Sequence, residues 1–464
     1  SCRGDAGRRD GSRPEARVRN PAATPGFSIQ ATDRSPGAKL NSRACCAGAL
    51  ARLAGPSYGA GTMSQSVSQI AAPDARAHAR GLLTLGLPLV GSNLAQFAMH
   101  TTDTLMVGWY DVTALAGLVI SSSVFFVFFI VGSGFAHAVM PLAAAAAGTE
   151  DDTQVRRVTR MGIWLSVFYG AALTPFILWS EGLFLAIGQE PDVAREASIY
   201  LSIAGFSLIP QLLIMTLRSY LAALERTQVV LWVTLGSAGL NIPLNYALIF
   251  GNWGAPELGI RGAAIASVVL SVLGLLVLIA YVVRATPEYS LFRNVHRPDW
   301  EAFGRVFRLG WPIGLTLFAE VGLFTGASVM MGWVGKLELA AHGIALNIAS
   351  ATFMVHLGLA SAVTVRAGRA YKLGDSGVLR LGSGVALSLS MAFVALTVFA
   401  FLMFPKPLIG LYLASDEPAR DVILATGAYL LAFAALFQLV DAVQVMTLGM
   451  LRGVQDTRVP MVMA

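Results

Sequence analysis

Three carboxylate side chains fall inside long apolar stretches of the sequence. They belong to Asp103, Glu320 and Asp441. A charged group at membrane depth is costly, so such a carboxylate either takes a proton or binds a cation. We place no lysine or arginine at a similar depth, and we therefore expect proton or cation coupling at these positions. The alternative is that each is a neutral acid that holds helices together.

Two asparagines extend this chemistry. Asn241 and Asn245 flank Pro243, and their spacing puts both amides on one face of a helix. The proline frees a backbone carbonyl oxygen between turns. Together with Asp103 they would form an oxygen-rich pocket for Na⁺ or a proton, and a polar patch between packed helices is an equal alternative.

Four histidines lie in or near the apolar stretches, namely His100, His137, His342 and His356. Histidine titrates near neutral pH, so each could relay protons. A packed, hydrogen-bonded role is the more common one for a lone histidine in a helical bundle.

Composition identifies the setting of these groups. Of 464 residues, 55% are hydrophobic and 13% are charged, whereas about a quarter of a soluble domain is charged. The apolar stretches are long enough to cross roughly 30 Å of hydrocarbon as helices. The sequence therefore predicts an all-α, multi-pass membrane protein. We expect ten spans, near 82–109, 114–142, 162–180, 197–217, 229–250, 262–283, 309–334, 339–364, 381–404 and 422–449.

Loop charges orient the chain. After the first 62 residues, most lysines and arginines fall on the side at which the first span begins. Positively charged loops stay in the cytoplasm. We therefore expect a cytoplasmic amino end and a location in the bacterial inner membrane.

Residues 1–62 form a basic tail that accounts for the whole net charge of +6 and holds all three cysteines. An Arg- and Ser-rich tail fits a transit peptide, a disordered arm, or translated upstream sequence. We favour the last, with the true start at Met63 and a cytoplasmic lead over 63–81.

An internal repeat divides the membrane part. Leu85–Pro88 begins the first span and Leu309–Pro312 begins the seventh, an offset of 224 residues. Because six spans separate the copies, both enter the membrane in the same direction and form parallel repeats. We expect an N-terminal lobe of six helices over 82–284 and a cytoplasmic linker over 285–308. The C-terminal lobe over 309–464 would hold four of its six helices, with the last two missing from this chain.

The two copies differ in charge. At the offset of 224 residues the repeat pairs Glu320 with Gln96 and gives Asp103 an alanine partner. Farther along the chain the offset becomes 230, and there Asp441 pairs with Gln211. The acidic versions of the first two positions thus lie in the second lobe. This asymmetry predicts two unlike polar sites, one in each lobe.

The sequence lacks two motifs that are typical of hydrolytic enzymes. The sequence has neither the G-x-x-x-x-G-K-[ST] phosphate loop nor the H-E-x-x-H metal motif, so it does not hydrolyse nucleotides or peptides by those routes. We expect a protein that is not an enzyme, needs no organic cofactor and binds no nucleic acid. The coupling ion would be H⁺ or Na⁺.

Six separated segments carry a family resemblance: Pro88–Gly108, Asn241–Asn245, Gly254–Gly259, Phe318–Val321, Val365–Arg369 and Asp441–Val445. In order and spacing they resemble the multidrug and toxic compound extrusion (MATE) transporters of NorM type, over about residues 80 to 464. The resemblance implies the MATE fold, two pseudo-symmetric six-helix lobes around a V-shaped cavity. It also implies export of organic cations in exchange for H⁺ or Na⁺.

Where this sequence matches the family's motifs, the resemblance also implies which residues form the binding sites. The resemblance implies a proton or cation site at Glu320 and Asp441, where Na⁺ would be the metal. It implies another at Asp103, Asn241 and Asn245. The substrate cavity would be lined by Gln96, Met99, Gln211, Phe324, Phe437 and Gln438.

Two other functions compete with this interpretation. A lipid-linked oligosaccharide flippase of similar repeat architecture would need a cationic cavity for phosphate, and the charges that we place in the membrane are all acidic. An intramembrane aspartate hydrolase would need paired carboxylates in a recognisable motif, and none is visible. We therefore expect a multidrug efflux antiporter that acts as a monomer in the lipid bilayer on small organic cations.

Overall fold

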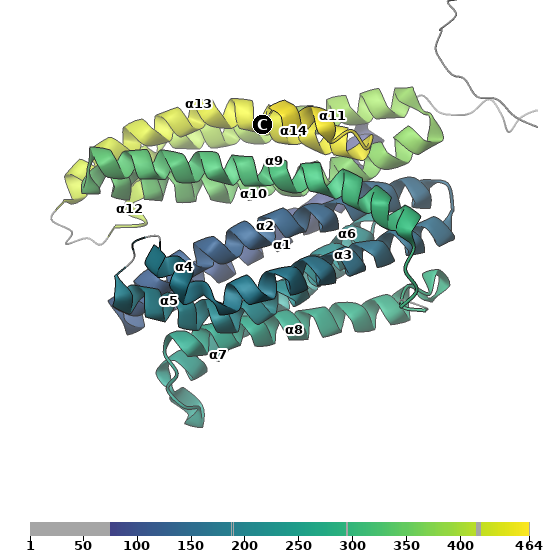
Figure 1. The fold of residues 1–464 in the computed structure, drawn as a ribbon. Helices are drawn as coiled ribbons and strands as arrows, with labels where there is room; N and C mark the ends of the chain where they lie inside the picture. Colours follow the sequence, from purple (N-terminus) through teal and green to yellow (C-terminus); the bar gives the residue numbers. More distant parts are fainter. Residues whose placement is uncertain (1–74, 187, 189, 294–295, 414–418, 464) are drawn as a thin grey trace, which may run out of the picture. The chain divides into compact units, whose positions relative to one another are not determined.

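The computed structural model describes residues 75–186, 188, 190–293, 296–413 and 419–463, and every regular element in these ranges is a helix (Figure 1). Ten helical stretches are long and apolar enough to cross a membrane, which confirms the predicted number of spans. The tail over residues 1–62 and the lead over 63–81 up to residue 74 lie outside the described residues.

The first lobe contains six of these spans. Its elements are α1 (Ala75–Tyr110), α2 (Val112–Gly148), α3 (Asp152–Leu178), α4 (Ser180–Ala186), α5 (Pro191–Ala204), η1 (Gly205–Ser207), α6 (Leu208–Ala223), α7 (Thr227–Phe250), η2 (Asn252–Gly254), α8 (Ile260–Ala285) and η3 (Pro287–Tyr289). Helices α5 and α6 join through η1 into a single span.

The second lobe repeats this order with four spans among the described residues. Its elements are α9 (Trp300–Val334), α10 (Lys336–Leu373), α11 (Ser376–Met403), α12 (Pro405–Gly410), α13 (Arg420–Gly453) and α14 (Arg458–Met463). At the offset of the repeat, α9 corresponds to α1 and α10 to α2. Both lobes are therefore built from the same succession of helices.

Aspartate side chains cap the first turn of several helices, and two of these caps lie at positions related by the repeat offset. Asp151 accepts a hydrogen bond from the backbone N–H of Gln154, and Asp375, at the same offset, accepts one from Val378. Such caps satisfy backbone donors that a helix start leaves without partners. Asp299 caps α9 through Ala302, so this helix begins earlier than residue 309, where the sequence placed its start.

One end of the bundle carries most of the arginines. We call it the basic end: α1 and α9 begin there, and α2 and α10 end there. The lobes come closest near it. A Cβ added at Gly134 in α2 would lie 2.4 Å from the backbone nitrogen of Gly314 in α9. At Gly358 in α10, a Cβ would lie 2.6 Å from the backbone nitrogen of Val90 in α1. Only glycine permits such approach of two backbones.

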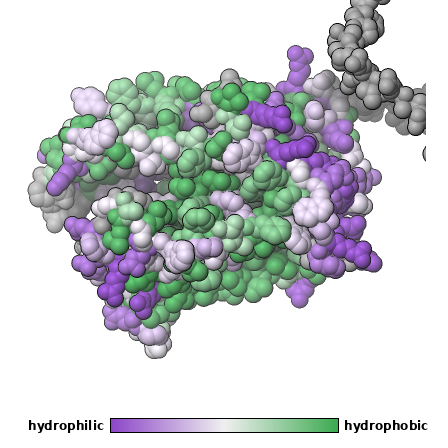
Figure 2. Space-filling model, viewed as in Figure 1, coloured by the Kyte–Doolittle hydropathy of each residue, from purple (hydrophilic) through white to green (hydrophobic). Residues whose placement is uncertain are grey.

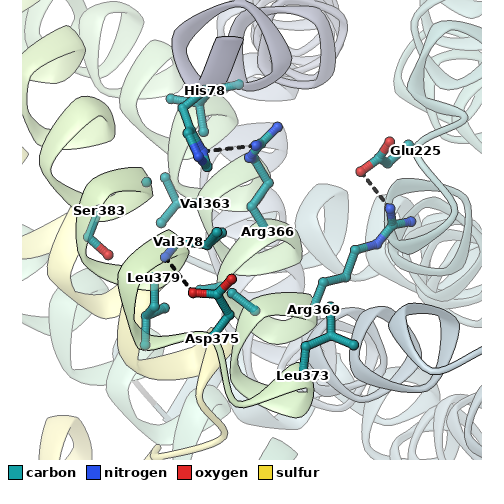
Figure 3. Close-up of a pocket in the computed structure, with 14 residues that line it drawn as sticks. His78, Glu225, Val363, Arg366, Arg369, Leu373, Asp375, Val378, Leu379 and Ser383 are labelled. Carbon is teal, nitrogen blue, oxygen red and sulfur yellow. Dashed lines mark hydrogen bonds and ion pairs between the residues drawn. The ribbon is translucent and has the colours of Figure 1, made fainter. Parts of the chain in front are cut away.

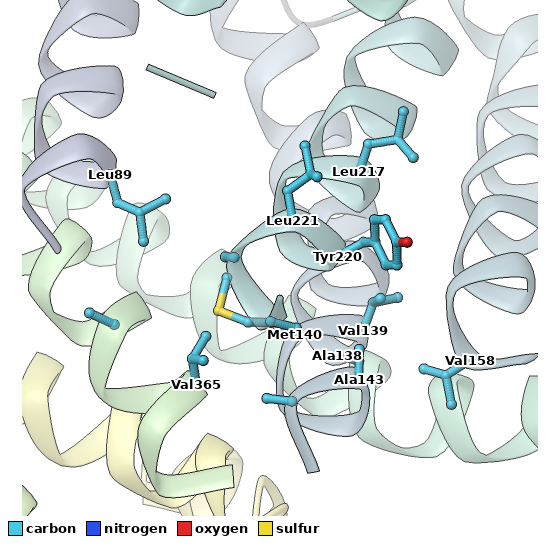
Figure 4. Close-up of a cluster of buried hydrophobic side chains, with 14 of the residues drawn as sticks. Leu89, Ala138, Val139, Met140, Ala143, Val158, Leu217, Tyr220, Leu221 and Val365 are labelled. Carbon is cyan, nitrogen blue, oxygen red and sulfur yellow. The ribbon is translucent and has the colours of Figure 1, made fainter. Parts of the chain in front are cut away.

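A hydrophobic core fills the same region and joins both lobes (Figure 4). It combines Leu89 of α1, Met140 of α2, Val158 of α3, Tyr220 of α6 and Val365 of α10. Tyr220 is fully buried, and its hydroxyl donates to Thr286. Dense packing near the basic end therefore holds the lobes against each other there.

The surface is apolar between two polar ends (Figure 2). At the end opposite the basic end, four tryptophans are largely exposed: Trp109, Trp179, Trp253 and Trp333. Tryptophan prefers the interface between lipid and water. The apolar surface between the two polar ends, together with these tryptophan side chains, agrees with a protein that spans a bilayer.

Candidate functional site

The first lobe contains a pocket of about 110 Å³ between α1, α2, α6, α7 and α8, and several polar side chains line it. The sequence-predicted residues Gln96, Met99, Gln211, Asp103 and Asn241 all line it. They come from three different helices, which the fold brings together.

Asp103 is the acidic centre of this first-lobe pocket. Its Oδ1 atom accepts hydrogen bonds from the side-chain nitrogens of Asn241, at 2.8 Å, and Asn245, at 2.6 Å. Both asparagines lie on α7, one turn apart, and are 1% and 0% exposed. The predicted grouping of these three residues is therefore present in the structure.

The amides also leave oxygen atoms without partners. The Oδ1 atoms of Asn241 and Asn245 are buried and accept no hydrogen bond from the described residues. A buried polar atom without a partner costs roughly 1–3 kcal/mol, and such atoms are rare. Two orphaned amide oxygens beside a carboxylate form an oxygen-rich group of the kind that hard cations prefer.

Arg218 occupies another part of the same pocket, and here one sequence-based expectation is wrong. We expected no arginine at the depth of the carboxylates, whereas Arg218 lies within α6 and is only 7% exposed. It donates to Gln96 Oε1 at 2.7 Å, to Asn93 Oδ1 at 2.9 Å and to Ser92 Oγ at 3.0 Å. Hydropathy alone assigns an arginine to a loop outside the span. Here three side-chain oxygens of α1 accept hydrogen bonds from the Arg218 guanidinium inside the lobe.

The second lobe has a larger and more apolar pocket of about 630 Å³, between α9, α10 and α13, with α2 at one side. Glu320 of α9 and Asp441 of α13 both line it, as do the predicted residues Phe324, Phe437 and Gln438. Two carboxylates from different helices therefore share one cavity, and Asp103 lies in the other.

Neighbouring side chains position the groups of this second-lobe pocket. Gln444 donates to Glu320 Oε1 at 3.0 Å. The rings of Phe324 and Phe437 meet edge to face, with 5.7 Å between their centroids. Gln438 donates to Thr352 and accepts from Thr397 at 2.8 Å, so it also links three helices. Gln444 lies in one of the segments that carry the family resemblance but was not among the predicted site residues, because its contact depends on how α13 packs on α9.

Three of the four predicted histidines divide into two kinds. His100 lines the first-lobe pocket and His342 the second-lobe pocket. His356 is 1% exposed and pairs with Ser390 at 3.0 Å, which is the packed role. Among the described residues, no group of three or more histidine, cysteine or acidic side chains is placed to hold a metal ion.

A third pocket, of about 250 Å³, lies at the basic end, where α10 contacts the first lobe (Figure 3). Arg369 donates to the Glu225 carboxylate and to the backbone oxygen of Ala223, each at 2.7 Å. Arg366 lies 3.1 Å from His78 Nδ1. The residues at this place tie α10 to α1 and to the turn after α6, so they close the lobes against each other.

Two repeat-related lobes of membrane-spanning helices, each with a pocket that carries at least one carboxylate, define a membrane transporter rather than an enzyme. The MatE family model matches residues 88–247 and 312–464. The chain belongs to this family, and the resemblance found in the sequence is confirmed.

Curated relatives are similar over most of their length. A probable multidrug resistance protein NorM from Rhizobium meliloti is 47% identical over 390 residues, which cover 83% of this chain and 83% of the relative. A protein of the same name from Agrobacterium fabrum is 40% identical over 389 residues, covering 83% and 84%.

Solved structures share the fold. The eukaryotic MATE transporter AtDTX14 superposes with a TM-score of 0.71 at 20% identity, covering 82% of this chain and 84% of that one. A MATE protein in complex with MaL6 gives a TM-score of 0.76 at 18% identity, covering 83% and 85%. The predicted fold class is therefore confirmed.

Proposed function

We propose that this chain is a multidrug efflux antiporter, which exports small organic cations across the inner membrane in exchange for H⁺ or Na⁺. Its amino end would face the cytoplasm, and it would act as a monomer. The relatives named multidrug resistance proteins support the substrate class. The carboxylates in both pockets support cationic ligands, because opposite charge is the main attraction available at that depth.

The arrangement around Asp103 carries the proposal of ion coupling. Its carboxylate and the two buried amide groups of Asn241 and Asn245, which donate to it, bring several oxygen atoms close together. A cation bound there would gain oxygen ligands and relieve the cost of the orphaned atoms. A proton would neutralise the carboxylate and give it a single O–H donor, which satisfies at most one of the two amide oxygens.

The second-lobe pocket suits the exported compound. Its volume lies within the range of small-molecule sites, and its walls are mostly apolar. Aromatic faces such as those of Phe324 and Phe437 attract organic cations. Glu320 and Asp441 would offset the positive charge, or bind the coupling ion when the compound leaves.

Competition between ion and compound would drive the exchange. Binding of Na⁺ or H⁺ removes the negative charge that holds the organic cation, so its affinity falls in the ion-bound state. A ligand shifts a conformational equilibrium only by its difference in affinity for the two states. Return to the other state would require the contacts at the basic end, such as Arg369 with Glu225, to separate.

Ethidium efflux from proteoliposomes tests the proposal. The protein is reconstituted with an imposed Na⁺ gradient or an imposed pH gradient, and the wild type is compared with Asp103→Asn and Glu320→Gln. Glu181→Gln is the matched control, since Glu181 is an exposed carboxylate outside both pockets. We expect efflux under one gradient, with a loss in both pocket variants and none in the control.

The outcome assigns the ion. Efflux that needs Na⁺ points to the oxygen group around Asp103, and efflux that needs a pH gradient points to protonation. Absence of efflux by the wild type under either gradient would contradict the proposal, and export of a lipid-linked sugar would then be measured in the same vesicles.

A further inference from the structure

The pocket at the basic end holds two arginine side chains that line neither of the pockets proposed for transport. It measures about 250 Å³ and lies between the start of α1, the end of α10 and the start of α11. Arg366 and Arg369 of α10 both line it, and Figure 3 shows His78 opposite Arg366 and Glu225 opposite Arg369. The family resemblance includes the segment that holds these arginines, yet the proposed export assigns no ligand to them.

Arg366 carries a charge that no carboxylate offsets in the described part of the chain, where every acidic oxygen is more than 4.0 Å from its guanidinium. It donates to the uncharged His78 Nδ1 at 3.1 Å. The two carboxylates that line the pocket have other partners, since Glu225 accepts from Arg369 and Asp375 caps the start of α11. A guanidinium has five N–H groups, so Arg366 keeps donors for a ligand.

The backbone of α1 makes room for this guanidinium. A Cβ added at Gly81 would collide with Arg366 Nη1, so the group lies against the first lobe while its helix belongs to the second. The repeat does not require an arginine at this place. At the offset of 224 residues, α2 has Leu142 where α10 has Arg366, and Ala145 where α10 has Arg369. Because α2 reaches the same end of the bundle without arginines, helix packing alone does not explain them.

Depth and lining place the pocket among lipid headgroups. Arg366 precedes Leu373, the last residue of α10, by seven residues, or roughly 10 Å of helix. The headgroup layer of a bilayer is roughly 5–7 Å thick, so Arg366 lies near its inner edge. Leu82 and Val363 give the same pocket an apolar wall, and Tyr371 beside it is exposed. A phosphate attached to acyl chains would cover this wall, whereas a free phosphate would not.

We propose that the pocket at the basic end binds the headgroup phosphate of an anionic phospholipid, with Arg366 as its main ligand. Arginine binds phosphate through several N–H groups of one planar fork, and basic pockets between membrane helices hold anionic headgroups. The volume lies below the range of sites that enclose a whole drug-sized molecule, so it suits a headgroup. The lipid would contact α1 of the first lobe and α10 of the second, and thereby stabilise the closed basic end.

Native mass spectrometry of the full chain, released from detergent micelles, tests this directly. The probes are dioctanoylphosphatidylglycerol and dioctanoylglycerol, which have the same acyl chains, but only the first has a phosphate. The wild type should bind the phosphatidylglycerol about tenfold more strongly, the gain expected from a hydrogen bond to a charged group. Equal binding of the two would overturn the proposal without any variant.

Two soluble probes distinguish a lipid from a free phosphate. Glycerophosphoglycerol is the same headgroup without acyl chains, and inorganic phosphate is the anion alone. Both should bind at least about tenfold more weakly than the lipid, because neither covers the apolar wall. If either binds as strongly as the lipid and depends on Arg366, the pocket is a site for soluble phosphate compounds and the lipid proposal is wrong.

Two kinds of variant locate the effect. Arg366→Gln should lower the ratio of phosphatidylglycerol to dioctanoylglycerol binding by about tenfold, and Arg366→Lys, which keeps the charge, should retain part of it. Arg297→Gln is the control, because Arg297 is exposed at the same end and lies outside the pocket. Ser383→Phe fills the pocket without touching the arginines and should also lower the ratio, whereas Ser383→Ala should not. An unchanged ratio in folded Arg366→Gln or Ser383→Phe would overturn the site.

This inference goes beyond the proposed export, and its test uses neither ethidium nor an ion gradient. Thermal unfolding gives a second measurement, since a ligand of the folded state stabilises it. Phosphatidylglycerol should raise the melting temperature of the wild type more than dioctanoylglycerol does, and Arg366→Gln should remove this difference. Binding that depends on Arg366 in a protein that exports no ethidium would leave the lipid site standing and contradict the antiport alone.

Discussion

The pockets of the two lobes are built on repeat-related helices and yet differ in size and charge. The first, about 110 Å³, combines one carboxylate with two asparagines and a buried arginine. The second, about 630 Å³, is mostly apolar and combines two carboxylates with a pair of phenylalanines. At the repeat offset, Gln96 of the first lobe stands where Glu320 stands in the second.

The difference shows which features of a duplicated lobe are held fixed and which are free. The helix caps Asp151 and Asp375 keep equivalent positions, and so do the glycines Gly134 and Gly358. These residues satisfy backbone geometry that both copies share. The side chains that face the pockets satisfy no such requirement, so they can diverge and give the lobes different ligands.

The largest effect should come from the acidic pair of the second lobe. Asp441→Asn keeps the shape of the side chain but removes its charge, so coupled ethidium export should fall by about tenfold or more. Efflux from proteoliposomes at equal protein content measures it. Asp421→Asn, an exposed carboxylate in the first turn of the same helix, is the control. Unchanged export in Asp441→Asn would remove the second lobe from the coupling mechanism.

The glycines test what the lobes share. Gly134→Ala forces a Cβ against the backbone of Gly314, and overpacking of this kind costs about 1–3 kcal/mol. Gly358→Ala should cost a similar amount, because its Cβ meets the backbone of Val90. Gly236→Ala has open space and should be neutral or stabilising, since alanine favours a helix. Thermal unfolding in detergent ranks the three, and equal melting temperatures would refute the shared close packing.

The amides of the first lobe should have a smaller effect. Asn241→Ala removes a hydrogen bond to Asp103 and one of the orphaned oxygens. We expect the half-saturating concentration of the coupling ion to rise by about tenfold, the value of one hydrogen bond to a charged group. Ethidium efflux against ion concentration gives this number. Asn347→Ala, at an exposed position of α10, is the control and should leave the half-saturating ion concentration unchanged. If Asn241→Ala behaves like this control, Asn241 is not part of the ion site.

The smallest effect concerns the junction between the lobes, where α3 meets the start of α9. Arg157 donates to the carboxylate of Asp299 and holds the pKa of Asp299 below its usual value. The stability from this contact is therefore present above the pKa of an unfolded aspartate, near 3.9, and is lost as the pH falls through the lower, folded value. Asp299→Asn, which keeps the cap, should melt a few degrees lower than the wild type at neutral pH. The difference should shrink as the pH falls below about 3.9, and a difference that stays constant with pH would contradict this account.

Sequence reasoning predicted much of the fold because hydrophobic length and repetition are local signals. Ten spans, the two lobes and their parallel orientation follow from runs of apolar residues and from matching segments such as Leu85–Pro88 and Leu309–Pro312. Helix starts were less accurate, since the cap at Asp299 extends α9 into a segment that looked like a linker. The grouping of Asp103 with Asn241 and Asn245 was also predicted, because helical spacing aligns the two amides.

By itself, the sequence determined that this chain spans a membrane, repeats a helical lobe and buries carboxylates, because these properties depend on residue type and spacing along the chain. Only the tertiary structure decided which side chains meet. It brought Arg218 of α6 to three oxygens of α1, and Gln444 of α13 to Glu320 of α9. Contacts between distant helices depend on packing, and packing converts an arginine that hydropathy assigns to a loop into the cationic wall of a pocket.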